Sequence, residues 1–280
     1  MKEGTLEPPV FSCRQATAAE LPVVVSMPHT GVAVPPAIAG EFASDEIAAL
    51  PMTDWHLHRL YDFLPALGIA TIHAHYSRFV VDLNRPPKPQ SLYPGRFETG
   101  LVASETFAGE PIWETNPSAE IIEHRRLEFH QPYHEKLEAM LAERVSRFGR
   151  AFLIDAHSVA SMANKLHGEL GHEIYLGDRD GQSCRPAMMA FFAGEFSQAG
   201  LAVCRNEPYK GGYTTDHYGQ MPAVQALQIE MCQRVYMDEA DPAGGPDHPK
   251  FSPIKQKLRE IFSNFSKFVA DDSHGQWKST

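Results

Sequence analysis

Cysteine is scarce in this chain, with four residues in 280, at Cys13, Cys184, Cys204 and Cys232. They are scattered along the sequence, and none forms a Cys-x-x-Cys spacing. This distribution argues against a disulfide framework, and it also argues against a zinc site built from cysteine thiolates.

Positive charge is also in short supply, because 25 Lys and Arg residues face 35 Asp and Glu residues and leave a formal net charge of −10. A surface for nucleic acid or for an anionic membrane is therefore disfavoured. The balance does not exclude an anionic substrate, because a few arginines and a metal ion can set the potential inside a cleft. No basic region followed by an apolar stretch opens the chain, and no apolar run reaches membrane-spanning length. We expect a cytoplasmic protein.

The length and the 43% apolar share suit one sizeable core, so we predict a single domain over residues 1–280. Residues 1–20 form a loose lead-in in this prediction. Residues 88–117 are rich in Gly, Pro, Ser and Thr and are interpreted as a long loop excursion. We find no internal repeat and no linker that would divide the chain.

Strand and helix patterns alternate along most of the sequence. Predicted strands lie at 21–27, 69–74, 78–85, 151–155, 174–176, 201–205 and 224–230. Predicted helices lie at 54–67, 118–148 with a kink at Pro132, 185–199 and 254–269. The alternation predicts an α/β fold with a mixed, mostly parallel sheet and helices on both of its faces.

Two histidines follow buried strands at the end where open α/β sheets usually bind ligands. His157 comes after an apolar strand that ends at Asp155, and Asp155 could orient its imidazole. His29 comes after a valine-rich strand. Each could instead be an ordinary turn histidine, but two at separate strand ends favour a metal site.

A third metal ligand should be a carboxylate, and Asp54 is the leading candidate. The alternative is that Asp54 is the N-cap of the helix predicted at 54–67. Spacing alone does not separate these two roles.

Two further positions carry side chains suited to a substrate and to proton transfer. Asn84 and Arg85 could bind a carboxylate, with Arg78 adding charge nearby. The alternative is an internal pair between Asp82 and Arg85. Glu230, at the end of an apolar strand, could be a general base beside a metal, or it could be an exposed strand-end glutamate.

Six short stretches, in this order, resemble the N-formylglutamate amidohydrolase (deformylase) family over most of residues 20–240. They are SMPHTG at 26–31, TDW at 53–55, SRFVVDLNRP at 77–86, DAHS at 155–158, YKGGY at 209–213 and QIE at 228–230. That family is distantly similar to zinc carboxypeptidases and aspartoacylase. The resemblance therefore implies a zinc-carboxypeptidase-like fold of the phosphorylase/hydrolase-like type.

The resemblance also implies roles for single residues. His29 and His157 would be metal ligands, Asn84 and Arg85 would bind the substrate carboxylate, and Glu230 would be the base. The chain departs from the carboxypeptidase pattern at Val32, where that pattern has a glutamate ligand. The missing carboxylate is the reason that Asp54 enters as the third ligand.

The implied reaction is metal-dependent hydrolysis of N-formyl-L-glutamate to formate and L-glutamate, at the end of one route of histidine degradation. Zinc suits these ligands, although manganese, cobalt or iron could occupy the site. The remaining candidates for holding the substrate are Arg205, at the end of a predicted strand, and the loop formed by Gly211, Gly212 and Tyr213. In that loop the glycines would let the backbone approach the ligand while Tyr213 closes over it, or they are an ordinary flexible turn.

Two alternatives remain open at the level of the sequence. One is a zinc-dependent deacylase or carboxypeptidase-like hydrolase of another N-acyl amino acid, and the other is a non-catalytic binder of small acidic ligands. In each case the partner is a small acidic molecule. The sequence does not specify an oligomeric state.

Overall fold

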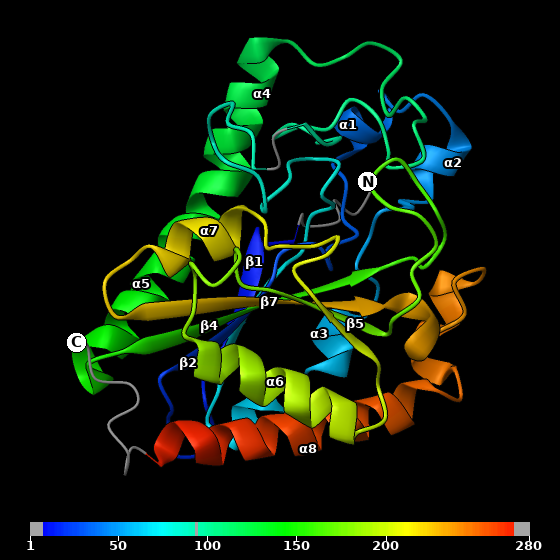
Figure 1. Ribbon diagram of the computed structural model, residues 1–280. Coiled ribbons are helices and arrows are strands. Elements are labelled where there is room, and N and C mark those ends of the chain that lie inside the picture. The colour runs from blue at the N-terminus through cyan, green and yellow to red at the C-terminus, as the bar shows by residue number, and fades with distance from the viewer. Residues whose placement is uncertain (1–7, 93–94, 272–280) are drawn as a thin grey trace, which may run out of the picture.

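The computed structural model describes residues 8–92 and 95–271 and contains one seven-stranded sheet (Figure 1). Residues 1–7 of the predicted lead-in and residues 93–94 of the predicted loop excursion lie outside the described residues. The strands are β1 (Phe11–Arg14), β2 (Val23–Met27), β3 (Ala70–Ala74), β4 (Ala151–Val159), β5 (Ile174–Gly177), β6 (Val203–Arg205) and β7 (Val224–Cys232). Their order across the sheet is β1-β3-β2-β4-β7-β5-β6. The pairs β1–β3 and β5–β7 are antiparallel, and the other four pairs are parallel.

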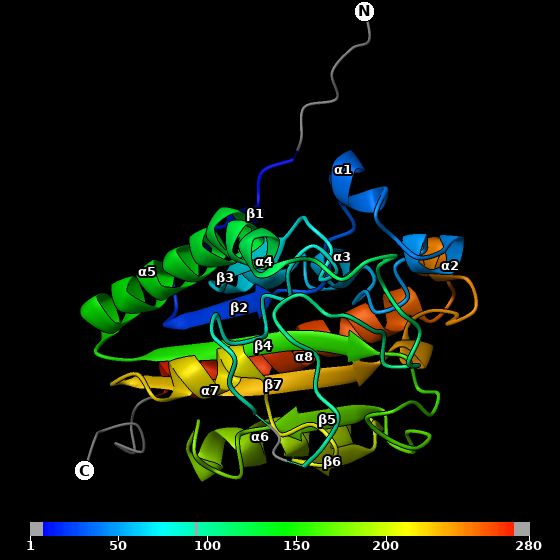
Figure 2. The ribbon, with the colours of Figure 1, turned by 90° about the horizontal axis from the view of Figure 1, so that it is seen from above.

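Helices cover both faces of this sheet. The α-helices are α1 (Pro36–Ala39), α2 (Asp45–Ala48), α3 (Leu57–Leu60), α4 (Ala119–Arg125), α5 (Gln131–Phe148), α6 (Pro186–Gln198), α7 (Tyr213–Gly219) and α8 (Phe251–Ala270). Helices α6 and α8 lie on one face, and α5 and α7 lie on the other (Figures 1 and 2). The predicted α/β class with a mixed sheet is confirmed. Within the described ranges, no helix is long and apolar enough to cross a membrane.

The longest helix shows how the sequence creates the core on the α8 face. Buried residues recur along α8 with helical spacing, at Ile254, Leu258, Ile261 and Phe265. These side chains belong to the largest hydrophobic cluster of the described residues, in which they pack together with residues of the central strands. Burial of each such side chain contributes about 1.5–3 kcal/mol to the free energy of folding, so α8 stabilises the sheet on this face.

On the face covered by α5, the side chains of β4 and β7 change from apolar to polar toward the carboxyl ends of the strands. In β4, Leu153 packs in the core beneath α5, and the next residues on the same face are Asp155 and His157. In β7, Ala226 lies in that core, and Gln228 and Glu230 follow on the same face. The period of two therefore brings polar side chains together over the carboxyl halves of β4 and β7.

Both strands are longer than the sequence pattern predicts. β4 continues to Val159 and β7 to Cys232, because the two pair in parallel through the register Val159↔Cys232. His157 and Glu230 consequently lie inside strands and not beyond their ends, and they are Cα partners in this register.

Two predictions about extended segments are wrong. The lead-in contains β1, which pairs with β3 at the edge of the sheet. Residues 78–85 form turns instead of a strand. Their apolar side chains are buried in two clusters, Phe79 in one and Val80 in the other, and the Asp82 amide donates to the Leu101 carbonyl at 2.7 Å. The segment is therefore apolar because its side chains are buried, and not because it pairs as a strand, which explains why its sequence pattern predicts a strand.

The prediction of one continuous helix over residues 54–67 is also wrong. It is reduced to α3 and a 3₁₀ turn, η1 (Leu64–Leu67), and His56 before α3 has a positive φ of 62°. Pro65 cannot donate a backbone hydrogen bond, so it fits the first turn of η1 but not the interior of a longer helix. The Asp54 amide instead donates to the His29 carbonyl at 3.0 Å.

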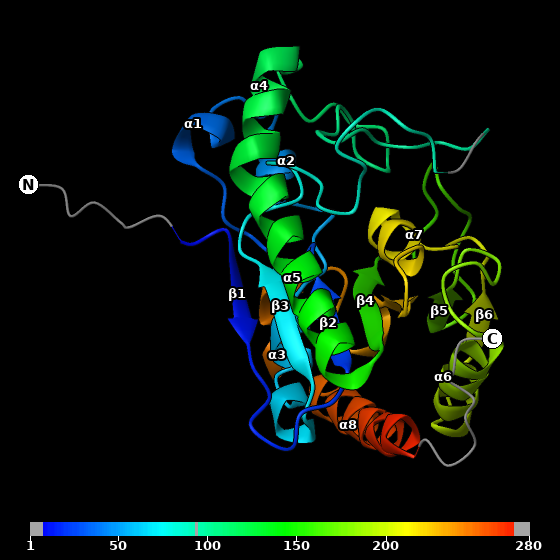
Figure 3. The same cartoon turned by 90° about the vertical axis from the view of Figure 1, so that its left-hand side faces the viewer.

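The predicted helix at 118–148 exists and contains a π-helical segment, η2 (Arg126–His130), between α4 and α5. Figure 3 shows the three as one long rod. Pro132 lies in the first turn of α5, directly after the π turn. A π turn removes a regular i→i−4 bond, which is where a proline is tolerated without ending the helix.

Candidate metal centre and active site

A cavity of about 490 Å³ lies over the carboxyl halves of β4 and β7. All six sequence stretches that carry the family resemblance contribute to its wall. Their lining residues are His29, Thr53, Asp54, Arg78, Asn84, Arg85, His157, Ser158, Tyr209, Gly212, Gln228 and Glu230. Segments that are more than 200 residues apart in the chain, near 29 and 230, thus meet in one place.

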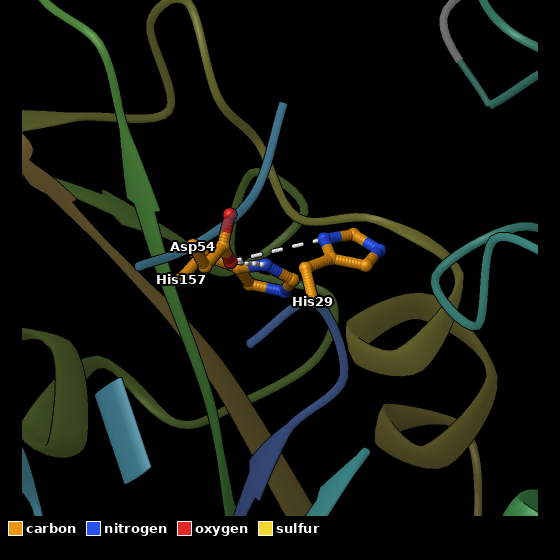
Figure 4. Close-up of side chains that lie close together, drawn as sticks. All are labelled: His29, Asp54 and His157. Atoms are coloured by element: carbon orange, nitrogen blue, oxygen red, sulfur yellow. Dashed lines mark hydrogen bonds and ion pairs between the residues drawn. The ribbon is translucent and has the colours of Figure 1, made fainter. Parts of the chain in front are cut away.

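His29, Asp54 and His157 form a compact group in this cavity (Figure 4). One ligand atom from each lies within 4.8 Å of the other two, and all three residues are buried. The Asp54 Oδ2 atom is 3.0 Å from His157 Nδ1 and 3.8 Å from His29 Nδ1. The N-cap role for Asp54 is wrong, because the residue that precedes α3 as its N-cap is His56.

Each imidazole is held from behind by a second carboxylate. His29 Nε2 is 2.7 Å from Asp82 Oδ1, and His157 Nε2 is 3.0 Å from Asp155 Oδ2. A carboxylate accepts hydrogen bonds, so His29 donates its Nε2–H to Asp82 and its Nδ1 faces Asp54. His157 Nδ1 is hydrogen-bonded to Asp54 Oδ2 at 3.0 Å, and its Nε2 is 3.0 Å from both Asp155 Oδ2 and Asn84 Nδ2. The predicted orienting role of Asp155 agrees with this geometry.

One buried atom of this group lacks a partner. His29 Nδ1 has no hydrogen-bond partner among residues 8–92 and 95–271. Buried polar atoms are rarely left unpaired, and such an exception calls for a missing ion or water. Two imidazole nitrogens and a carboxylate oxygen are the donor set of a catalytic zinc site, so the residues fit a divalent cation.

The charges around the two histidines differ. Burial lowers the pKa of His29, and the Arg78 guanidinium lowers it further. Burial also opposes the charge on His157, but the Asp155 and Asp54 carboxylates outweigh it and raise the pKa of His157 well above its usual value. A proton on His157 and a cation at its Nδ1 would therefore compete for the same site.

Asp82 links the metal group to an arginine. Arg78 donates to Asp82 Oδ2 at 2.7 Å, while Asp82 Oδ1 accepts from His29. Although burial opposes ionisation, Arg78 and His29 hold the pKa of Asp82 well below its usual range. The alternative pair between Asp82 and Arg85 is present only in the backbone, where the Arg85 amide donates to the Asp82 carbonyl at 3.2 Å, while the Arg85 Nε atom donates to the Thr99 carbonyl at 2.9 Å.

Glu230 lies beside His157 on the neighbouring strand and faces the cavity. It is buried, so the alternative of an exposed glutamate is wrong. Gln228 donates to Glu230 Oε2 at 2.9 Å, and Gln228 Oε1 accepts from the Gly212 amide at 2.8 Å. Burial is the main cause that raises the pKa of Glu230 to about 8. A carboxyl group with such a pKa can both accept and return a proton near neutral pH.

The predicted substrate-binding residues divide into two sets. Arg78, Asn84, Arg85 and Gly212 line the cavity. Arg205, Gly211 and Tyr213 are not among the described residues that line it.

The two side chains in the second set have clear locations. Arg205 is exposed at the end of β6, which is the edge strand opposite β1. Tyr213 begins α7 and stacks on His217 with 5.0 Å between ring centroids. Neither side chain lines the cavity, so the structure gives no support to the contact with the substrate that the sequence predicts for them.

Two residues of the site were not assigned a role in it from the sequence. Asp82, which orients His29, was considered only as a partner of Arg85. Gln228, which orients Glu230, is the residue two positions before it on the same face of β7. The alternation within β7 is the signal that could have identified Gln228.

Residues 21–237 match the model of the N-formylglutamate amidohydrolase family. The N-formylglutamate deformylase of Pseudomonas aeruginosa is 41% identical over 226 residues, which cover 79% of this chain and 84% of the relative. The enzyme of the same name from Pseudomonas putida is 38% identical over 227 residues, with the same two shares.

Solved structures agree with this similarity. The crystal structure of N-formylglutamate amidohydrolase from Ralstonia eutropha JMP134 superposes with a TM-score of 0.80 and 26% identity, covering 93% of this chain and 98% of that one. A structure from Agrobacterium tumefaciens has a TM-score of 0.70 at 17% identity, covering 94% of this chain and 95% of that one. The second likeness concerns the fold alone.

Proposed function

Because this chain belongs to the N-formylglutamate amidohydrolase family, we propose that it hydrolyses N-formyl-L-glutamate to formate and L-glutamate. The observation that carries the proposal is the group of His29, Asp54 and His157 beside the buried Glu230 in one cavity. The test is release of free glutamate by the purified protein from the formyl, acetyl and succinyl derivatives of glutamate, with formate measured as the second product of the formyl derivative. Turnover of the acetyl or succinyl compound in preference to the formyl compound would contradict the proposed substrate.

Zinc is the proposed metal, held by His29 Nδ1, His157 Nδ1 and a carboxylate oxygen of Asp54. When bound, such an ion lowers the pKa of water and polarises a carbonyl oxygen. The orphan nitrogen of His29 supports this role. Zinc as the metal, a cytoplasmic location and a place in histidine degradation stay predictions from the sequence.

Glu230 is the proposed proton carrier. Its carboxylate takes a proton from the water that attacks the formyl carbon, and it returns a proton to the glutamate nitrogen as the C–N bond breaks. The bond from Gln228 holds one carboxylate oxygen and thereby orients the group toward the cavity. The products are formate and the free amino group of glutamate.

The substrate carboxylates are proposed to bind Arg85 and Arg78. Arg85 is anchored through Nε to the Thr99 carbonyl and through one terminal nitrogen to the Asn84 carbonyl at 3.0 Å. Arg78 is anchored by Asp82. Anchored guanidinium groups lose little freedom when they bind a carboxylate, so they fix the orientation of the substrate.

Arg85→Ala should raise KM for N-formyl-L-glutamate by roughly tenfold to a hundredfold with a smaller effect on kcat, because a charge-assisted hydrogen bond contributes about 1.5–3 kcal/mol. Initial rates over a range of substrate concentrations measure this. Arg205→Ala, at an exposed residue outside the cavity lining, is the matched control and should leave KM unchanged. Equal KM values in Arg85→Ala and the unaltered protein would show that Arg85 does not bind the substrate.

Gly212→Ala should lower kcat/KM by roughly tenfold to a hundredfold, since misplacement of a positioning group by about 1 Å has effects of this size. A Cβ at position 212 would lie 2.4 Å from Asn84 Nδ2, and Asn84 is held because its Oδ1 accepts from the Thr214 amide at 2.8 Å. The substitution therefore has to displace the Asn84 side chain. Gly171→Ala, where nothing lies within 4 Å of the added carbon, should have no effect. Unchanged kinetics in Gly212→Ala would show that the position of Asn84 is unimportant.

A further inference from the structure

The ligand Asp54 lies in a segment with little regular structure of its own. Residues 50–56 form turns and coil, and the segment is bounded by two non-glycine residues with positive φ, Leu50 at 56° and His56 at 62°. Its backbone is not stabilised by a helix or by strand pairing. The position of the Asp54 carboxylate must therefore depend on contacts from other segments.

Two side chains from one short turn hold the carbonyls on either side of Asp54. Gln233 Nε2 donates to the Thr53 carbonyl at 2.9 Å, and the Tyr236 hydroxyl donates to the Trp55 carbonyl at 2.9 Å. Gln233 begins the 3₁₀ turn η3 (Gln233–Val235), which directly follows β7, and Tyr236 comes next. Both side chains are buried.

Ser158 connects these two donors. Its Oγ atom is 2.9 Å from the Tyr236 hydroxyl and 3.4 Å from Gln233 Nε2. The Tyr236 hydroxyl is the donor toward both the Trp55 carbonyl and Ser158 Oγ, and Ser158 Oγ also accepts from Gln233 Nε2. Ser158 thus links the two side chains that hold the segment around Asp54.

The network joins the three segments that carry the site. Ser158 follows the ligand His157 in β4, and Gln233 comes three residues after Glu230. Together with the bond from the Asp54 amide to the His29 carbonyl, it fixes the Asp54 backbone on both sides and at its centre. It also gives a role to the serine of the DAHS stretch, which faces the opposite side of β4 from His157.

We propose that Gln233, Tyr236 and Ser158 are positioning residues that hold Asp54 at the distance from His29 and His157 that a metal ion requires. This inference rests on the proposed function only in taking Asp54 as a metal ligand. Partners that orient metal ligands typically change metal affinity by about tenfold to a hundredfold when they are removed.

The experiment measures the zinc affinity of Tyr236→Phe by competition with a chelator of known affinity, using the full chain and Zn²⁺ alone. The ring is retained, including its edge contact with Phe251 at 6.2 Å, so one hydroxyl is the only loss. We expect the zinc Kd to rise roughly tenfold to a hundredfold. Gln233→Met, which removes the donor to Thr53 at similar length, should have an effect in the same direction.

Tyr133→Phe is the matched control. It removes another buried tyrosyl hydroxyl, which is 2.9 Å from Ser26 Oγ and touches none of the three residues of the network. Its zinc Kd should equal that of the unaltered protein. An unchanged Kd in both Tyr236→Phe and Gln233→Met, or an equal rise in Tyr133→Phe, overturns the inference. An unaltered protein that fails to bind Zn²⁺ overturns the proposed metal site itself, which is a different result.

Discussion

Glu230→Gln is expected to lower kcat by roughly a hundredfold or more while the ratio of bound zinc to protein stays the same. Glutamine keeps the size of the side chain and can still accept the hydrogen bond from Gln228, but it cannot take a proton from water. His29, Asp54 and His157 are left intact, so the metal should remain. Turnover of N-formyl-L-glutamate and the metal content of the same preparation together measure the effect.

Glu260→Gln is the control for this substitution. Glu260 is an exposed residue of α8, outside the cavity, and its replacement should leave kcat unchanged. If Glu230→Gln kept more than about a tenth of the original kcat, a proton-transfer role of the usual size would be excluded. A loss of zinc in Glu230→Gln would instead assign the residue to the metal site.

Removal of the metal should have an effect of similar or greater size. Protein treated with a strong chelator is expected to lose at least a hundredfold in kcat, because neither the water nor the carbonyl is then activated. Added Zn²⁺ should restore the rate. Bound metal should also raise the Tm, because binding to the folded state alone stabilises it.

His157→Ala tests the same site without a chelator. It removes one of the ligand nitrogens, so both zinc content and turnover should be lost. His124→Ala provides the comparison, because His124 is 76% exposed on α4 and contributes nothing to the cavity wall. Full activity in the chelated protein, confirmed to be free of metal, would end the proposal of metal-dependent hydrolysis.

Much of the site could be predicted because strand-end chemistry is local in sequence. His29 and His157 each follow a run of buried apolar residues, and the structure brings them together as expected. Asp54 was harder, since a lone aspartate before an apolar run is equally typical of a helix N-cap. Because His56 has a positive φ, the helix begins only after it, at Leu57. The Asp54 carboxylate is therefore not used as an N-cap and lines the cavity.

The residues that the sequence did not place correctly around the cavity hold positions that depend on how segments are arranged in space. A three-residue strand does not reveal that it lies at the sheet edge, so nothing local places Arg205 two strands away from β7. The direction of Tyr213 depends on α7, which begins at Tyr213, whereas the two preceding glycines led us to expect a loop at this residue. The roles of Gln233 and Tyr236 depend on contacts about 180 residues distant in the chain.

The parallel pairing of β4 and β7 over nine residues stabilises only part of the site, so its residues should differ in their resistance to local unfolding. His157 and Glu230 belong to two central strands, whose amides we expect to exchange with solvent only when the whole core opens. Asp54 belongs to an irregular segment that is held by side-chain hydrogen bonds and one backbone bond to His29, and we expect it to detach at a lower free energy. Mild denaturant should therefore release the metal while the sheet persists, so loss of activity would precede loss of the fold.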